Sequence, residues 1–463
     1  MRLARGIIVV AAALAAGALA AAPAQAKPIA TDLGNVADSN SAIQLAGDRV
    51  VFLNRPQFTR GGSIDSVPAA GGKRRRLVSL KPTLKDGELS IRFDAVAGRL
   101  GYGVTEYLDP EGGQQSLNVE YAQVRSGPLD GPYDRVDGCD QPARIDPRDV
   151  RVSATAIFHM GFGCDSAPLT ARGLAPPGYV RQLEDPSLVG FAASASMAGD
   201  FLAYARGTAG GTRVFNHAAG ATAYDLPQSG TTALQDDGKL FMASRASALG
   251  GGARCAIDLI WFSPAEPTAH QIPHKGCNAD IAIAGDRLVF NRQTTGVSSE
   301  LVSTNLQGGD VRVLARFAWA SSLLSLDTDG PRVAWHALGC YTDTLHVAPL
   351  DAAPVPSPPE LCKLAIRSKT IAVRKGRAEI PLSCPKGCNF VTGTFTFASD
   401  DRAFNSKRVR FKGPKGTLKV KLTKKQLARV KDGKAKKVPL SVGWLDATGR
   451  YRFAEAKVKL VAR

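Results

Sequence analysis

A short apolar segment preceded by a turn containing glycine or aspartate recurs along most of the chain. Copies of this pattern occupy residues 46–52, 97–102, 198–204, 237–241, 284–290 and 329–335, and a degenerate copy occupies residues 153–158. Self-similarity at a spacing of about 40 to 50 residues indicates an architecture built from repeated units. The sequence therefore predicts seven units, each with at least one buried strand.

The sixth unit shows how one repeat is built. Its four predicted strands are residues 281–284, 287–291, 300–305 and 311–315. Four short antiparallel strands per unit are typical of a β-propeller blade, and radially arranged blades bury both faces of their inner strands. That burial suits continuous apolar runs such as residues 49–53 better than strict alternation does. A series of β-sandwiches is the alternative.

The turn and strand at residues 285–290, Gly-Asp-Arg-Leu-Val-Phe, resemble the repeat of TolB-type and related WD-like β-propellers of bacterial secreted proteins. The resemblance extends over roughly residues 36 to 362, and no unit carries the complete Ser-Pro-Asp-Gly form of that repeat. It implies a platform for binding or scaffolding, and it identifies no ligand.

Apolar and basic residues alternate along residues 409–412, 418–422 and 456–460, the period-two pattern of half-buried strands. We expect a small β-sandwich here, with residues 413–416 joining the first two strands as a hairpin and residues 423–429 forming one helical turn. The side chains predicted to point inward are Val409, Phe411, Leu418, Val420, Leu422, Val458 and Leu460. The predicted outward, polyanion-binding side chains are Arg408, Arg410, Lys412, Lys419, Lys421, Lys457 and Lys459.

The C-terminal part, including its Cys384 and Cys388 pair and residues 422–429 and 446–449, is similar to bacterial immunoglobulin-like modules at the C-termini of actinobacterial exported proteins. Such modules are adhesive or structural, so the resemblance implies no active site. The expected fold class is all-β, a seven-bladed β-propeller followed by a small Ig-like β-sandwich. The expected boundaries are a signal peptide at 1–26, the propeller at 27–352, a proline-rich linker at 353–361 and the basic sandwich at 362–463.

The N-terminal residues have the pattern of a secretory signal peptide. Arg2 and Arg5 precede an apolar stretch at residues 7–22, and Ala24-Gln25-Ala26 forms a small-residue cleavage site. We expect cleavage after Ala26 and an extracytoplasmic protein associated with the cell envelope. The alternative is an uncleaved membrane anchor, which normally needs about 20 apolar residues.

The formal net charge of +18 is concentrated in the C-terminal part. Residues 363–463 contain 27 Lys and Arg against 6 Asp and Glu, a net charge of +21, whereas residues 27–362 contain 30 against 35, a net charge of −5. Such a one-signed excess indicates an anionic partner. Outside the cell we expect an anionic wall polymer or a membrane surface, and not nucleic acid. The ordinary alternative is that the lysines of this part only keep the protein soluble.

Eight cysteines in an exported chain are expected to form disulfides. In the blade arrangement, loops that share one end of the propeller bring cysteines together in pairs. The predicted pairs are Cys139 with Cys164, Cys255 with Cys277, Cys340 with Cys362, and Cys384 with Cys388.

Candidate catalytic residues are sparse. The sequence has no Gly-x-Ser-x-Gly nucleophile elbow and no phosphate-binding glycine loop. His270 and His274 with Cys277 lack a helix that would align them as metal ligands, so we expect neither a metal site nor a cofactor. The acidic pairs are expected to serve turns: Asp236 with Asp237, Asp134 with Asp137, and Asp327 with Asp329.

These observations predict a secreted, non-enzymatic binding protein that is monomeric. Its propeller would present a loop face to a ligand or to another envelope protein, and its basic module would associate with an anionic envelope polymer. The alternative is an extracellular carbohydrate-active enzyme whose site lies in the propeller funnel, where carboxylates from several blades could meet.

Overall fold

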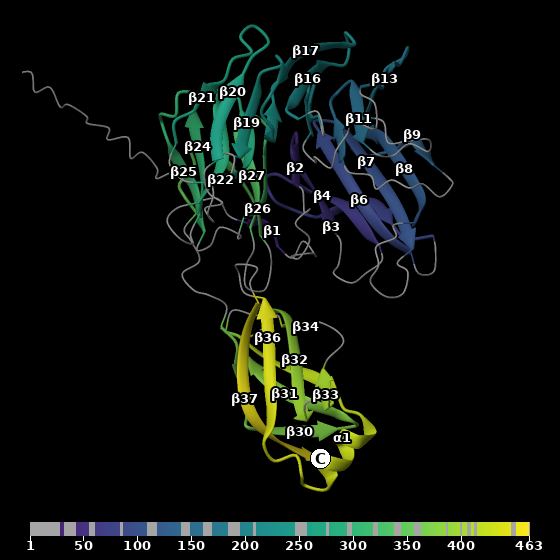
Figure 1. The fold of residues 1–463 in the computed structure, drawn as a ribbon, viewed down its shortest axis with the longest axis vertical. Helices are drawn as coiled ribbons and strands as arrows, with labels where there is room; N and C mark the ends of the chain where they lie inside the picture. The colour runs from purple at the N-terminus through teal and green to yellow at the C-terminus, as the bar shows by residue number, and fades with distance from the viewer. Residues whose placement is uncertain are drawn as a thin grey trace, which may run out of the picture.

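Strands make up nearly all of the regular structure in this computed structural model (Figure 1). The described residues are 28–31, 43–54, 61–83, 87–108, 118–139, 149–160, 169–183, 195–206, 210–245, 257–274, 277–293, 299–317, 323–337, 344–355, 363–385, 388–398, 401–404, 409–411, 414–445 and 451–462. No helix within these ranges is both long enough and apolar enough to cross a membrane.

Several sequence predictions fall outside the described residues. The signal peptide at residues 1–26 is among them. So are four cysteines and two basic residues, namely Cys164, Cys255, Cys340, Cys362, Arg408 and Lys412. The backbones of Cys139, Cys277 and Arg410 are described but their side chains are not. The three propeller disulfides therefore remain predictions.

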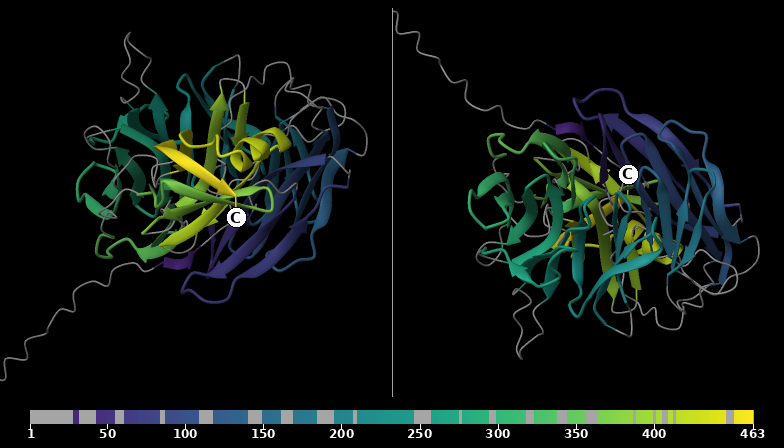
Figure 2. Two further views of the ribbon diagram at one scale, coloured as in Figure 1. Left: turned by 90° about the horizontal axis from the view of Figure 1, so that it is seen from below. Right: turned by 90° about the horizontal axis from the view of Figure 1, so that it is seen from above.

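The described part of the chain up to residue 349 forms seven four-stranded antiparallel sheets, which confirms the predicted seven blades (Figure 2). The inner strands are β2 (Ile43–Ala46), β6 (Gly87–Val96), β10 (Asp149–Val152), β14 (Ala195–Ala198), β18 (Gly230–Leu234), β22 (Cys277–Ala284) and β26 (Leu323–Thr328). The second strands are β3 (Arg49–Asn54), β7 (Arg99–Leu108), β11 (Ala156–Met160), β15 (Phe201–Ala205), β19 (Leu240–Arg245), β23 (Arg287–Gln293) and β27 (Arg332–Ala337).

The outer half of each blade follows the same order. The third strands are β4 (Gly62–Pro68), β8 (Asn118–Pro128), β12 (Leu169–Gly173), β16 (Thr212–Asn216), β20 (Ile257–Phe262), β24 (Ser299–Asn305) and β28 (Thr344–Pro349). The outermost strands are β5 (Arg75–Leu80), β9 (Asp134–Cys139), β13 (Val180–Gln182), β17 (Ala221–Leu226), β21 (His270–Gln271), β25 (Arg312–Phe317) and β1 (Pro28–Thr31).

The seventh blade takes its outermost strand from the N-terminal side of the chain, because β1 pairs antiparallel with β28. The repeat pattern did not predict this arrangement. Successive inner strands contact one another around the axis, and β26 also contacts β2. The first and seventh blades are therefore joined both at the axis and through the chain, and the ring is closed.

The recurring Gly-Asp turn connects the first two strands of several blades. Gly47 and Gly285 have φ values of +63° and +62°, and each is the first residue of a two-residue hairpin turn. A positive φ at that position matches a type II′ turn, for which glycine is favoured. The turn positions the next strand, in which Val50, Val51 and Phe52 are all buried. Consecutive burial confirms that both faces of these strands are covered.

Apolar side chains join neighbouring blades. In one core, Val50 and Phe52 from the first blade pack with Ala334 and Leu345 from the seventh. Burying a side chain of this size contributes about 1.5 to 3 kcal/mol. The predicted linker also takes part, since the backbone of Val355 bridges to Ala315 at the outer edge of the sixth blade.

The C-terminal part forms a separate nine-stranded arrangement around one core. Its elements are β29 (Ala365–Ile366), β30 (Thr370–Arg374), β31 (Arg377–Ser383), β32 (Cys388–Ala398), β33 (Asp401–Phe404), β34 (Val409–Phe411), β35 (Lys415–Lys421), α1 (Lys424–Lys431), β36 (Val438–Leu445) and β37 (Tyr451–Ala462). The strand order is β29-β31-β30-β37-β36-β32-β33, with β34 paired to β32 and β35 paired to β31.

Two local predictions for this part need correction. The strands at residues 409–411 and 415–421 do not pair with each other, so the predicted hairpin at 413–416 is wrong. Each of these strands alternates in the same way, and alternation determines which face is buried without determining the neighbouring strand. The helix is also longer than one turn. It begins after Thr423, whose side chain forms a capping box with Gln426, and it continues to Lys431.

Candidate functional site

A cavity of about 950 Å³ lies where the inner strands of all seven blades meet. It is lined by residues along those strands and by several of the turns that follow them, including Gly47, Gly285 and Gly330. Its charged lining residues are Arg92, Asp94, Asp149, Arg151, Asp236, Asp280, Asp327 and Asp329. Carboxylates that are far apart in the sequence therefore converge on the propeller axis.

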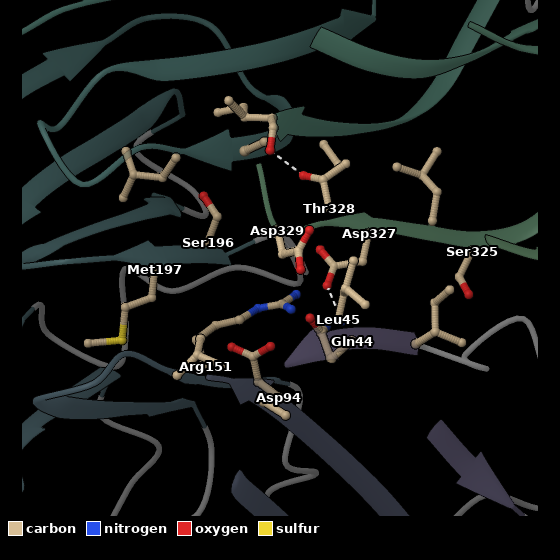
Figure 3. A pocket seen from close by; sticks show the side chains of 18 of the residues that line it. Gln44, Leu45, Asp94, Arg151, Ser196, Met197, Ser325, Asp327, Thr328 and Asp329 are labelled. Carbon is tan, nitrogen blue, oxygen red and sulfur yellow. Dashed lines mark hydrogen bonds between the residues drawn. The ribbon is translucent and has the colours of Figure 1, made fainter. Parts of the chain in front are cut away.

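Arg151 lies at the centre of this group. Figure 3 shows its guanidinium directed toward the carboxylates of Asp94, Asp327 and Asp329. Its ion-pair partner is Asp149, with a distance of 3.2 Å between the guanidinium Nη2 and the carboxylate Oδ2. Asp149 also accepts hydrogen bonds from the backbone N–H groups of Val150 and Ala195, at 3.0 and 3.3 Å.

Asp94 and Asp327 each link their own inner strand to the inner strand of the next blade. The Oδ2 atom of Asp94 accepts a hydrogen bond from the backbone N–H of Val152 at 2.8 Å. In the same way, the Oδ2 atom of Asp327 accepts from the backbone N–H of Leu45 at 2.6 Å (Figure 3). These bonds satisfy backbone donors on the inner edge of a blade that has no further strand. Asp327 therefore belongs to an inner strand, which corrects its predicted place in a turn.

The pKa values of these carboxyl groups are raised toward neutral pH. Burial raises the pKa of Asp94 to about 6, opposed first by the charge of the Arg151 guanidinium and then by the Val152 N–H hydrogen bond. Burial also raises the pKa of Asp327 to about 7, opposed by its backbone hydrogen bonds. Burial also raises the pKa of Asp149 and that of Asp280. Asp94 and Asp327, which both lie beside Arg151, consequently change charge between mildly acidic and neutral pH.

The sequence did not identify Asp94, Asp149, Asp280 or Arg151 as site residues. Their strands lie in different repeats, and only ring closure brings them together. One local signal is present, because charged and apolar residues alternate at Arg92 and Asp94 on β6 and at Asp149 and Arg151 on β10. Such alternation in an inner strand indicates a polar surface at the axis.

The other acidic and histidine candidates have local partners. Asp237 accepts from the backbone N–H of Lys239 at 2.9 Å, as expected of a turn residue. Asp137 lies 3.2 Å from the Nε2 atom of His159, and although burial opposes it, this contact helps to lower the Asp137 pKa. His270 stacks on Trp261 with ring centroids 4.1 Å apart. Within the described residues, no three potential ligands gather as a metal site.

The predicted Cys384–Cys388 disulfide is present in the C-terminal part. The other cysteines are described incompletely, but two positions refine the prediction. Cys139 is the last residue of β9 and Cys277 is the first residue of β22, so both begin or end strands and do not lie within connecting loops.

The described basic side chains of the C-terminal part face solvent as predicted. The exposed side chains include Lys419, Lys421, Lys457 and Lys459. The apolar side chains predicted to point inward are buried, except for half-buried Val409. Lys419 is partly neutralised, because its Nζ lies 3.3 Å from a carboxylate oxygen of Glu379. The predicted residues also occupy strands in different parts of the sheet, with Arg410 on β34 and Lys421 on β35.

A different set of cations forms a continuous row. Arg374 lies directly opposite Arg377 in the β30–β31 pair, and Arg377 lies directly opposite Lys421 in the β31–β35 pair. All three side chains are exposed, and none has an ion-pair partner among the described residues. We call Arg374, Arg377 and Lys421 the basic row. Exposed Lys375 extends it at the turn between β30 and β31.

Comparison with known proteins assigns this chain to no family. No protein-family description matches the sequence, and no curated protein is significantly similar to it. A solved prolyl endopeptidase shares 13% identity with a TM-score of 0.46, over 76% of this chain and 54% of that one. This chain thus spans about half the length of that enzyme.

Two other solved propellers are similar at the same low level. TolB from Acinetobacter baumannii shares 12% identity with a TM-score of 0.34, over 65% of this chain and 77% of its own. The WD40 domain of Toxoplasma gondii coronin shares 12% identity with a TM-score of 0.39, over 70% of this chain and 84% of its own.

Proposed function

We propose that this chain is a secreted, non-enzymatic binding protein. Its basic C-terminal part acts as an immunoglobulin-like module that holds it to an anionic polymer of the cell envelope, and its propeller presents a binding surface. The observation that carries this proposal is the basic row of Arg374, Arg377 and Lys421.

Like charges directly opposite one another in a sheet are unfavourable, by about 0.2 to 1 kcal/mol for each pair. The basic row contains two such pairs in succession. An anion that contacts all three side chains would reverse the sign of this interaction. The row is therefore best explained by a polymer with regularly spaced negative charges, such as phosphate or uronate groups.

Solubility alone does not account for this arrangement. A surface of mixed charge keeps a protein soluble without self-repulsion. Glu379 shows that an acidic residue is tolerated on this face, since it lies between Ala372 and Lys419 in the sheet. The adjacent positions in the basic row nevertheless hold three cations.

The propeller supports a binding role more than an enzymatic one. Its carboxylates do converge at the axis, as the enzymatic alternative requires. However, Asp94, Asp149 and Asp327 each accept a backbone N–H from the next inner strand, and Asp149 is also paired with Arg151. These contacts give the carboxylates a part in closing the ring.

Retention of the full chain on purified cell wall tests the proposal. The triple variant Arg374→Gln, Arg377→Gln and Lys421→Gln should elute at clearly lower salt than the unmodified chain. The matched control is Lys431→Gln, Lys436→Gln and Lys437→Gln, which removes the same charge from exposed positions outside the row and outside the predicted polyanion-binding set. Equal loss of retention in both variants would mean that only total charge matters, and retention indifferent to salt would refute polyanion binding.

A further inference from the structure

We propose that the central cavity of the propeller binds a ligand through a primary alkylammonium group, as carried by a small diamine or by a lysine side chain. This inference is independent of the basic C-terminal part and concerns a different site. It rests on the charge balance of the cavity and on the partners of its buried carboxylates.

Carboxylates outnumber cations in the cavity lining. Six aspartates face two arginines there. Arg151 is paired with Asp149, and Asp329 forms an ion pair with Arg332 outside the lining. Arg92 donates to the backbone carbonyl of Ile91 at 3.2 Å and is not placed against a carboxylate. The cavity therefore favours a cation and repels an anion.

Asp94, Asp149 and Asp327 share one cation, Arg151, whose guanidinium interacts electrostatically with all three carboxylates. Its ion pair is with Asp149, and among the described residues neither Asp94 nor Asp327 forms an ion pair of its own. The hydrogen bonds found for Asp94 and Asp327 come from backbone N–H groups and leave acceptor capacity on both carboxylates. Figure 3 shows both carboxylates beside the Arg151 guanidinium. One guanidinium does not neutralise three carboxylates, and a bound cation would balance the remaining negative charge.

The lining also narrows the type of cation. Quaternary ammonium groups are usually bound by aromatic rings. The one aromatic residue among the lining residues described here is Phe93, which is buried in the core between the first and second blades. A primary ammonium needs hydrogen-bond acceptors and no ring, because it carries three N–H donors. The free carboxylate oxygens of Asp94 and Asp327 meet that need.

Binding of this kind should strengthen as the pH rises. The other charged residues of the cavity lining are Arg92 on β6, Asp149 and Arg151 on β10, Asp236 after β18, Asp280 on β22 and Asp329 after β26. Asp94 and Asp327 have pKa values of about 6 and about 7, so both are mostly protonated at pH 5 and ionised at pH 8. An alkylammonium group stays charged over this range, and we expect affinity to rise at least about tenfold.

Isothermal titration of the full chain with cadaverine and with Nα-acetyl-lysine amide tests the proposal. We expect saturable binding at pH 8 that weakens at pH 5. The neutral analogue 1,5-pentanediol and the anionic analogue glutarate should not bind. The relative affinities of the two amines then distinguish a free diamine from a lysine side chain. Absence of binding by both amines at millimolar concentration, or equal binding of pentanediol or glutarate, would overturn the proposal.

Two cavity variants and one control locate the site. Asp94→Asn and Asp327→Asn should each weaken cadaverine binding at least about tenfold, the loss expected when one ion pair of a desolvated site is removed. Asp130→Asn is the control, because Asp130 is exposed and pairs with Arg75 away from the cavity. Equal affinity of all three variants would overturn the proposal. If a cavity variant does not fold, the pH dependence and the analogues still decide the outcome on the unmodified chain.

Discussion

The substitution Asp94→Asn should stabilise the propeller at pH 8 and have little effect at pH 4. Burial raises the pKa of Asp94 from 3.8 to about 6, so the folded state disfavours the charged form. Each unit of pKa difference corresponds to 1.36 kcal/mol, which gives a destabilisation of about 3 kcal/mol once the group is ionised. Asparagine is uncharged and keeps an oxygen that can accept from the Val152 N–H.

The sign follows from proton linkage. A carboxyl group whose pKa is raised by folding contributes no penalty below the pKa of the unfolded chain. The penalty grows as the pH rises from about 4 to 6 and stays constant above that range. The unmodified chain should therefore lose stability over this interval relative to Asp94→Asn.

Urea unfolding of both proteins at a series of pH values measures this difference. The difference in free energy of unfolding should increase with pH by up to about 3 kcal/mol in favour of the variant. A difference that does not change with pH would refute the reasoning. The reasoning would also be refuted if the free energy of unfolding of the unmodified chain rose with pH relative to that of the variant, because ionised Asp94 would then be stabilised on balance by a cation.

Two further predictions concern ring closure and metals. Removing residues 28–31, which form β1, exposes the outer edge of β28. Calorimetry should then show a lower Tm for the propeller and an unchanged transition for the C-terminal part. An unchanged propeller Tm would contradict the role given to β1. Chelator should leave the thermal midpoints unchanged, because no cluster of metal-ligating side chains is found within the described residues, and a fall of many degrees would point to a bound cation.

The blade architecture could be predicted from the sequence because its determinants are local. A glycine with positive φ followed by aspartate makes the turn, and consecutive apolar residues such as Val50, Val51 and Phe52 make a strand buried on both faces. A turn followed by a short apolar strand recurs in six units and in degenerate form in the third, at residues 153–158, and the number of copies gives the number of blades. The seventh blade's outer strand could not be found in this way, since β1 carries no such turn and pairs with residues more than three hundred positions away.

The candidate sites depended on contacts that local pattern does not specify. Alternation predicted that Lys419 and Lys421 are exposed, but it could not show that Lys421 lies opposite Arg377 and not beside the strand at 409–411. The cavity cluster combines Asp94, Arg151 and Asp327 from three blades. Their convergence requires the closed ring, and the alternation of charged and apolar residues in β6 and β10 is its local sign.

The salt dependence of binding to a soluble polyphosphate tests the central claim most directly. Each cation that contacts the polymer releases counterions, so the logarithm of affinity falls linearly with the logarithm of salt concentration. Changing Arg374, Arg377 and Lys421 to glutamine in the full chain should make that slope shallower by about 2 to 3, whereas the control with Lys431, Lys436 and Lys437 changed should keep nearly the original slope. Equal slopes for the basic-row variant and the unmodified chain would contradict the account.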